Sequence, residues 1–173
     1  MAFGDFTVDR NSAKYVLGSG GDIISYATDE PAFEFNADGS YKGLLVEPAA
    51  TNICLQSEDI TTTWSFSDAT RTADATTAPD GNTTADELTA TSSGPRIYQN
   101  ISVSAVKHTA SVFLKGNGLD FARITILSGS GYQFYGLSGS GTVGGSGGGT
   151  VDDATIEAYP NGWYRCTLTW TQA

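Results

Sequence analysis

The sequence has few charged residues, and basic residues are scarcest. Lysine and arginine number 9 and aspartate and glutamate 19, so the 173-residue chain carries a net charge of −10. Nucleic-acid-binding proteins need a basic surface to neutralise phosphates, which this composition does not provide. The same acidity argues against docking on anionic lipid. The low charge therefore excludes two broad binding classes and favours solubility and a basic partner surface.

Long apolar runs are also missing, and cysteine is scarce. No segment approaches the roughly 20 apolar residues of a membrane span. The first residues, Met1 to Asp5, lack the basic start and apolar stretch of a signal peptide. We therefore expect synthesis in the cytosol and reduced, buried thiols at Cys54 and Cys166, with a disulfide between them as the alternative.

Histidine occurs once, which limits catalytic chemistry. A Ser-His-Asp triad or a zinc site would have to use His108, and no G-x-S-x-G or H-E-x-x-H phrase accompanies it. The segment 106–109 reads as a hairpin turn, so we expect an exposed turn histidine. Adjacent carboxylates occur at 58–59, 86–87 and 152–153. Neighbours on a strand point to opposite faces, so these pairs do not make a glycosidase site. We expect no enzyme.

Glycine is abundant, with 21 residues, and serine and threonine fill the gaps. No window shows a sustained 3.6-residue period, so we predict almost no helix. Short apolar or alternating runs separated by turn signals favour an all-β sandwich or barrel. The clearest runs are 15–17, 23–26, 32–35, 41–46, 52–55, 86–89, 96–103, 110–115, 121–127, 132–137 and 163–170.

The first forty-odd residues read as an arm made of hairpins. The first two runs flank a Gly-rich turn at 18–21, and Asp38-Gly39 supplies the positive φ of a tight reversal. We expect residues 1–42 to form a docking arm, with residues 1–10 loose or held by a neighbour.

A Gly/Ser tract covers residues 136–149, and its segment 139–144 matches G-x-G-x-x-G. A dinucleotide site needs a strand before this motif and a helix after it, and here more glycine follows. We expect a loop that is mobile or pinned by a partner.

Three phrases occur in order along the chain. They are GLLVEPAATNICLQSEDITTTW (43–64), TAPDGNTTADELTA (77–90) and NGWYRCTLTW (161–170). Their order and spacing resemble a sandwich domain common in tailed-phage virion proteins, which is similar to jelly-roll carbohydrate-binding modules. The resemblance implies a jelly-roll-like β-sandwich over residues 43–173.

The chain departs from this family at two places. Ala50 stands where the family phrase has arginine. Relatives usually continue through further strands after the third phrase, whereas this sequence stops at Ala173. An unfinished sheet would expose an edge. The sandwich is therefore expected to be incomplete at its C-terminus, because the chain is a fragment or because a partner strand completes the sheet, or else the sandwich is a shorter one.

Aromatic and polar side chains are the candidates for glycan contact, because sugar C–H faces stack on aromatic rings. Arg96, Tyr98 and Asn100 share one face of a predicted strand, and Arg123 and Tyr135 lie on nearby strands. The alternative is that this face packs against the arm or a neighbouring subunit. The tryptophans Trp64, Trp163 and Trp170 are expected in the core or at corners.

No cofactor is expected. Related carbohydrate-binding sandwiches often hold calcium, and Asp59, Asp152 and backbone carbonyls would be the ligands. The chain has no Asp-x-Asp-x-Asp-Gly loop to support such a site.

The resemblance implies a non-catalytic structural or attachment component of a phage particle, located in the virion, displayed in multiple copies and anchored to capsid or tail proteins. The alternative function is a glycan-binding module that recognises host surface polysaccharide, free or linked to an enzyme. A homo-oligomer is expected, and the resemblance suggests a trimer.

Overall fold

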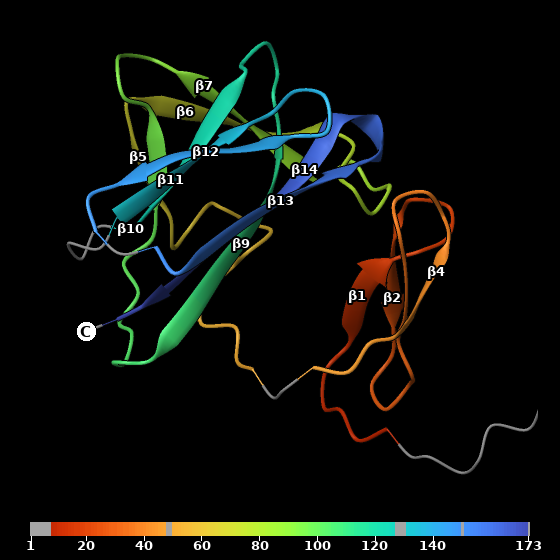
Figure 1. Cartoon of the computed structure of the whole chain (residues 1–173). Helices are drawn as coiled ribbons and strands as arrows, with labels where there is room; N and C mark the ends of the chain where they lie inside the picture. The colour runs from red at the N-terminus through yellow and green to blue at the C-terminus, as the bar shows by residue number, and fades with distance from the viewer. Residues whose placement is uncertain (1–7, 48–49, 127–130, 150, 173) are drawn as a thin grey trace, which may run out of the picture. The chain divides into compact units, whose positions relative to one another are not determined.

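The protein is all-β. The computed structural model describes residues 8–47, 50–126, 131–149 and 151–172 (Figure 1). These residues form fourteen strands, all paired antiparallel, and one short 3-10 turn at Pro160–Gly162. The predicted near-absence of helix is confirmed over this part of the chain. No helix among the described residues is long and apolar enough to cross a membrane.

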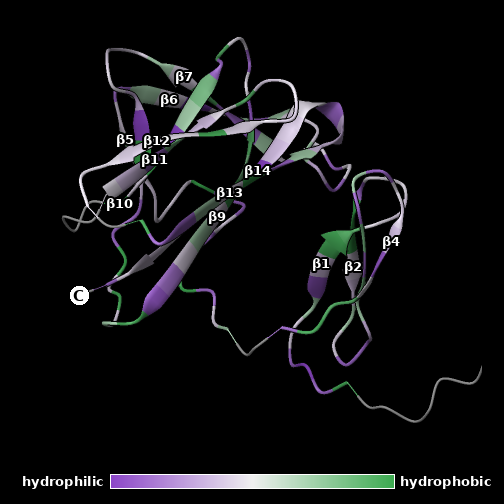
Figure 2. Ribbon diagram, viewed as in Figure 1, coloured by the Kyte–Doolittle hydropathy of each residue, from purple (hydrophilic) through white to green (hydrophobic). Residues whose placement is uncertain are grey.

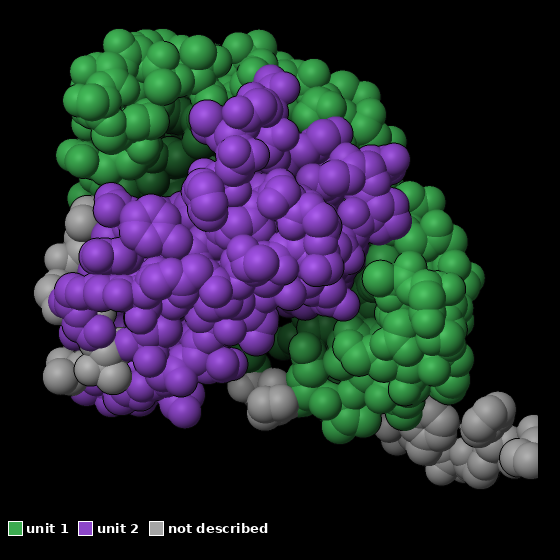
Figure 3. Space-filling model, turned by 45° about the horizontal axis from the view of Figure 1, so that its top comes forward, with its two compact units in different colours: residues 1–101 green, residues 102–173 purple. Residues whose placement is uncertain are grey.

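The chain divides into two compact units, residues 1–101 and 102–173, coloured separately in Figure 3. The predicted boundary between residues 42 and 43 lies inside the first unit. The second unit begins shortly before the first of its six strands.

Two hairpins open the first unit, as predicted. They are formed by β1 (Lys14–Leu17) with β2 (Ile23–Tyr26), and by β3 (Phe33–Phe35) with β4 (Tyr41–Leu44). The predicted reversal between β3 and β4 is present. Gly39 has a φ of 81°, and the Asn36 amide donates to the Ser40 carbonyl over 2.8 Å. A side chain at Gly39 would be strained at this φ, and its Cβ would lie 2.8 Å from the Ser19 carbonyl oxygen.

A small apolar core holds these hairpins together. Val16, Leu17 and Ala32 are buried, and Figure 2 shows β1 changing from hydrophilic at its start to hydrophobic at its arrowhead. Arg10 attaches the segment before β1 to the first hairpin. Its guanidinium donates to the carbonyls of Ser12 and Ala27. Residues 1–7, part of the segment predicted to be loose or docked, lie outside the described residues.

The rest of the first unit contains two further strand pairs. These are β5 (Ser65–Ser67) with β8 (Arg96–Tyr98), and β6 (Ala69–Thr76) with β7 (Ala85–Ala90). The turn between β6 and β7 is closed by a hydrogen bond of 2.8 Å from the Ala78 amide to the Asn82 carbonyl.

One predicted strand of this unit is wrong, and another is too long. Residues 52–55 form a loop, because the Asn52 side chain accepts from the Cys54 amide and replaces a strand partner. The run 96–103 stops being a strand after Tyr98. The next residue, Gln99, uses its side-chain amide to bond both the amide and the carbonyl of Leu55. A clean alternation of residue types did not reveal this side-chain bridge.

Two three-stranded sheets form the second unit. One has the order β13 (Asp153–Tyr159), β14 (Trp163–Thr171), β9 (Lys107–Lys115). The other has the order β10 (Phe121–Ile126), β11 (Gly131–Gly136), β12 (Thr142–Gly147). The Gly/Ser tract was predicted to be a loop, and this is wrong for β12, which pairs with β11. Backbone pairing with β11 orders this strand, and its glycine and serine side chains carry no pattern that would predict the pairing.

The two sheets pack through a core centred on Tyr135, Tyr164 and Cys166. Partly buried apolar residues from both sheets complete it, namely Leu114, Ile124, Leu137, Ala154, Ile156 and Ala158. The Tyr135 hydroxyl donates to the Thr167 carbonyl over 2.5 Å, which links β11 to β14 across the core. The unit is therefore sandwich-like.

The tryptophans behave largely as predicted. Trp163 and Trp170 are buried, with exposed fractions of 7% and 9%. Trp64 is half-buried and donates from its indole nitrogen to the Gln56 carbonyl over 3.1 Å, so it anchors a loop.

Both cysteines are free thiols, and they differ in burial. Burial raises the pKa of Cys166 to about 11, and it raises the pKa of the half-buried Cys54 as well. The thiolate is the reactive form, and Cys166 is fully buried. We expect iodoacetamide at pH 8 to modify Cys54 first and Cys166 only after unfolding, as measured by peptide mass spectrometry with and without denaturant. Equal labelling of both thiols in the native protein would contradict this burial.

Candidate binding faces

The five residues predicted to contact glycan are divided between the two units. Arg96 and Tyr98 lie on β8, and Asn100 follows that strand in the first unit. The Arg96 guanidinium carbon lies 6.0 Å from the Tyr98 ring centroid. Arg96 and Asn100 are exposed, and Tyr98 is half-buried. This part of the predicted patch is a short polar strand end with one aromatic ring.

The other two predicted residues, Arg123 and Tyr135, lie on adjacent strands but on opposite faces. In the register of β10 and β11, Arg123 pairs with Phe134, whereas Tyr135 pairs with Ala122. Paired residues share a face, and successive residues alternate. Tyr135 is fully buried, so placing it in an exposed patch was wrong. Its hydroxyl donates to the Thr167 carbonyl in the core, so the core accommodates both the apolar ring and the polar hydroxyl.

The residues that do share a face with Arg123 form an exposed aromatic surface. We define the β10–β12 outer face as Phe121, Arg123, Thr125, Tyr132 and Phe134, which follow from the strand register. The exposed fractions of Phe121 and Phe134 are 67% and 37%. The Arg123 guanidinium carbon lies 5.3 Å from the Tyr132 ring centroid and 5.7 Å from that of Phe134. These distances are typical of cation–π contacts.

The two rings of β11 on this face also contact each other. Tyr132 and Phe134 have ring centroids 5.5 Å apart and an interplanar angle of 78°, an edge-to-face arrangement. Edge-to-face pairs of this kind are favourable beyond the area that they bury. Arg123 and the two rings therefore form one connected cluster on the outer face, and this cluster limits the movement of all three side chains.

Gly147 on β12 makes room for the Tyr132 ring. A Cβ at Gly147 would lie 2.7 Å from the Tyr132 hydroxyl and 3.0 Å from its Cζ. The Tyr132 ring therefore lies over bare backbone. This gives the Gly-rich tract a structural role that its composition alone did not indicate.

The charge of this face differs from that of the whole chain. Strands β10, β11 and β12 contain no aspartate or glutamate, and Arg123 is their one charged residue. By contrast, the single strand β13 carries two carboxylates, Asp153 and Glu157. A neutral or anionic ligand can therefore approach the β10–β12 outer face without meeting a carboxylate on its strands.

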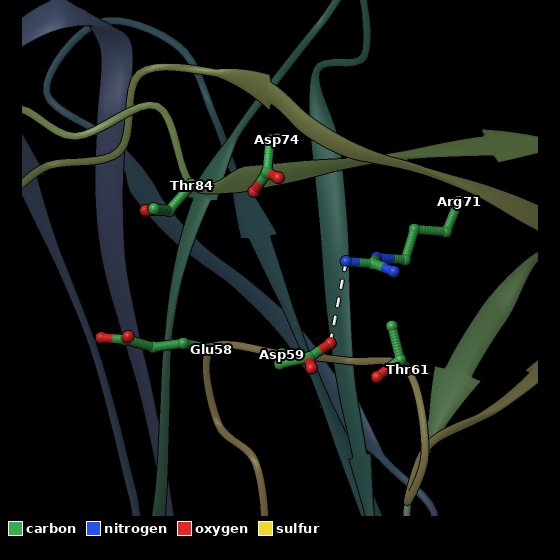
Figure 4. A pocket seen from close by; sticks show the side chains of 6 residues that line it. All are labelled: Glu58, Asp59, Thr61, Arg71, Asp74 and Thr84. Carbon is green, nitrogen blue, oxygen red and sulfur yellow. Dashed lines mark ion pairs between the residues drawn. The ribbon is translucent and has the colours of Figure 1, made fainter.

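The first unit contains an open hollow of about 410 Å³ (Figure 4). It is lined by Glu58, Asp59, Thr61, Arg71, Asp74 and Thr84. Arg71 donates from Nε to Asp86 over 2.6 Å, and a second guanidinium nitrogen lies 3.8 Å from Asp59. The bond to Asp86 raises the pKa of Arg71. The hollow is thus acidic, and its cation is already engaged.

The predicted calcium alternative gains no support from these contacts. Asp59 lies in this hollow beside Arg71, and Asp152 belongs to the second unit, where the Thr171 hydroxyl donates to it over 2.6 Å. Within the described ranges, no group of three or more His, Cys, Asp or Glu residues could hold a metal ion.

His108 was predicted in an exposed turn, which is wrong. It lies on β9 and is half-buried, because this strand begins at Lys107, three residues before the predicted start at residue 110. Its ring centroid is 5.4 Å from that of Trp170, and Nε2 is 2.9 Å from the Ser104 carbonyl oxygen. These contacts give His108 a packing role at the end of the sheet.

The G-x-G-x-x-G segment leads into a strand rather than a helix. Gly141 precedes β12, which begins at Thr142. A phosphate site of the dinucleotide type uses the N-terminus of a helix, so the motif does not form one here.

The sequence reasoning missed Phe121, Tyr132 and Phe134. The signal that could have found them was the period of two: residues 121, 123 and 125 share one face, as do 132 and 134. Tyr135 was predicted on this face in place of Tyr132 and Phe134. Successive residues of a strand point to opposite faces, so an assignment shifted by one residue places every side chain on the wrong face.

No protein-family model matches the chain, and no curated protein matches it.

Proposed function

We propose that this protein is a non-catalytic structural and attachment component of a tailed-phage particle, displayed in multiple copies and anchored through its N-terminal hairpins. The order and spacing of the three sequence phrases support the assignment to a phage particle. The observation that carries the anchoring role is exposed apolar surface on and just after the hairpins. Tyr15, Tyr41, Leu44 and Val46 have exposed fractions of 63%, 60%, 40% and 82%.

Clustered exposed apolar side chains mark interaction sites in soluble proteins. The exposed ring of Tyr41 is held in place by two neighbouring rings. Phe33 and Phe35 have ring centroids 6.2 and 5.6 Å from that of Tyr41. A pre-ordered aromatic surface loses little conformational freedom on docking, which favours binding.

The first experiment is electron microscopy of purified particles labelled with an antibody against this chain. Label on the head or tail supports a virion component and locates the docking partner. Intact particles without label would overturn the proposal.

Anchoring through the hairpins can be tested with one surface substitution. We expect Tyr15→Glu to lower incorporation into particles roughly tenfold or more, because an unpaired charge buried in an interface costs more than the 1.4 kcal/mol that a tenfold change represents. Quantitative immunoblotting of purified particles measures this. The matched control is Leu119→Glu, which alters a residue of similar exposure, 68%, in the second unit. Equal loss in both variants, or in neither, would contradict docking through the hairpins.

A second candidate function is glycan binding, free or beside an enzyme. The β10–β12 outer face is the specific observation that favours it, because it presents aromatic rings with polar neighbours on an open sheet surface.

A further inference from the structure

We infer that the β10–β12 outer face binds an acidic polysaccharide, with sugar rings stacked on Phe121 and Phe134 and sugar carboxylates facing Arg123. This inference rests on the glycan-binding candidate and deepens it by naming the site and the chemical class of the ligand.

The rings are placed to receive the apolar face of a sugar. Phe121 and Phe134 are the most exposed aromatic side chains of the face. They come from adjacent strands, and their backbone partners are offset, since Phe121 pairs with Gly136 and Phe134 with Arg123. An extended chain of sugars lying across the strands could therefore contact both rings. Contacts from several sugars of one chain add together, which strengthens individually weak stacking.

The strand β12 leaves the face open beside these rings. Its sequence, TVGGSG, contains three glycines, and a Cβ at Gly144 would lie 3.3 Å from Phe134 Cβ. Small residues keep that side of the face low, so a flat ligand meets rings rather than neighbouring side chains.

The preference for an acidic ligand follows from charge. Arg123 is the single charged residue on three strands that hold no carboxylate, in a chain with a net charge of −10. The Arg123 guanidinium carbon lies 5.3 Å from the Tyr132 ring centroid and 5.7 Å from that of Phe134, so the two rings hold the guanidinium and its N–H donors at this face. Those donors match the two oxygens of a carboxylate.

The test uses the full chain and two forms of one polysaccharide. Polygalacturonate carries a carboxylate on each sugar, and its highly methyl-esterified form has the same backbone with most of that charge removed. Biolayer interferometry on immobilised polysaccharide measures both affinities. We expect binding to polygalacturonate that is at least about tenfold tighter than to the ester, which corresponds to 1.4 kcal/mol. We also expect the difference to shrink as salt rises, because exposed charges are screened.

Substitutions locate the site. Phe121→Ala and Arg123→Gln are each expected to weaken binding to polygalacturonate about tenfold. Thr125→Glu places a carboxylate on the same face and should weaken it by at least as much. The matched control is Ser111→Glu, which adds the same charge to an exposed position of β9 in the other sheet and should change affinity less than about twofold. Unchanged thermal melting shows that the variants fold.

The two proposals fail in different ways. Three results would overturn this inference: no binding to either polysaccharide, equal binding to both, or equal loss of binding in Thr125→Glu and Ser111→Glu. None of these results bears on whether the antibody labels the particle. Reduced incorporation of Phe121→Ala into particles, with no effect on polysaccharide, would make this face a protein interface and also overturn it.

Discussion

Replacing Tyr135 with alanine is expected to lower the free energy of unfolding by about 3–5 kcal/mol, the range found when large buried aromatic residues are truncated. Tyr135 is fully buried between the two sheets of the second unit and is one of the largest side chains in their core. Truncation would leave a cavity and remove the hydrogen bond to the Thr167 carbonyl. Chemical denaturation followed by tryptophan fluorescence measures the change.

Two companion variants separate the ring from the hydroxyl. Tyr135→Phe keeps the ring and loses only the hydrogen bond, so we expect a cost of about 1–2 kcal/mol. Phe121→Ala removes an aromatic ring that is 67% exposed, and we expect a change within about 1 kcal/mol. If Tyr135→Ala were as mild as Phe121→Ala, the buried position of Tyr135 would be wrong.

Stability is expected to fall steeply as the pH rises from about 9 to 11. Burial raises the pKa of Cys166 from its ordinary 9.0 to about 11, so the folded protein retains a proton that the unfolded chain releases. The contribution is complete below pH 9 and is lost as the pH approaches 11. A shift of about two units corresponds to roughly 2–3 kcal/mol, at about 1.4 kcal/mol per unit. Urea denaturation at a series of pH values measures it.

The control is Cys166→Ala, in which the fall between pH 9 and 10 should flatten. Burial also raises the pKa of Tyr135, so a further loss of stability should remain above about pH 10 in this variant. Cys54→Ala should retain the part of the fall that Cys166 causes. A pH profile that is the same in all three proteins would show that burial of Cys166 does not produce the effect.

Most strands could be predicted because their side chains alternate. Residues 121–126 alternate between exposed and half-buried in the structure, as the period of two in their sequence indicates. The hairpin turns were also predictable, because Asp-Gly and Gly-rich turns depend on local backbone preferences. These signals are carried by neighbours in the sequence and do not need the rest of the fold.

Two of the failures have a common cause. The strand β12 was missed because glycine and serine carry no side-chain pattern, and its backbone is ordered by pairing with β11. The loop at 52–55 was predicted as a strand because its apolar residues resemble a strand pattern. That pattern does not indicate the hydrogen bond from the Cys54 amide to the Asn52 side chain. In both cases a hydrogen bond outweighed the pattern of residue types.

The sequence by itself determined an all-β chain with N-terminal hairpins, low charge and one histidine, because these follow from composition and short-range periodicity. Only the tertiary structure decided which aromatic residues are exposed. Tyr135 and Phe134 are adjacent in sequence, yet one fills the core and the other lies beside Arg123 on the surface. The reason is that a strand alternates between two faces, and only the packing of the second sheet selects which face becomes the core.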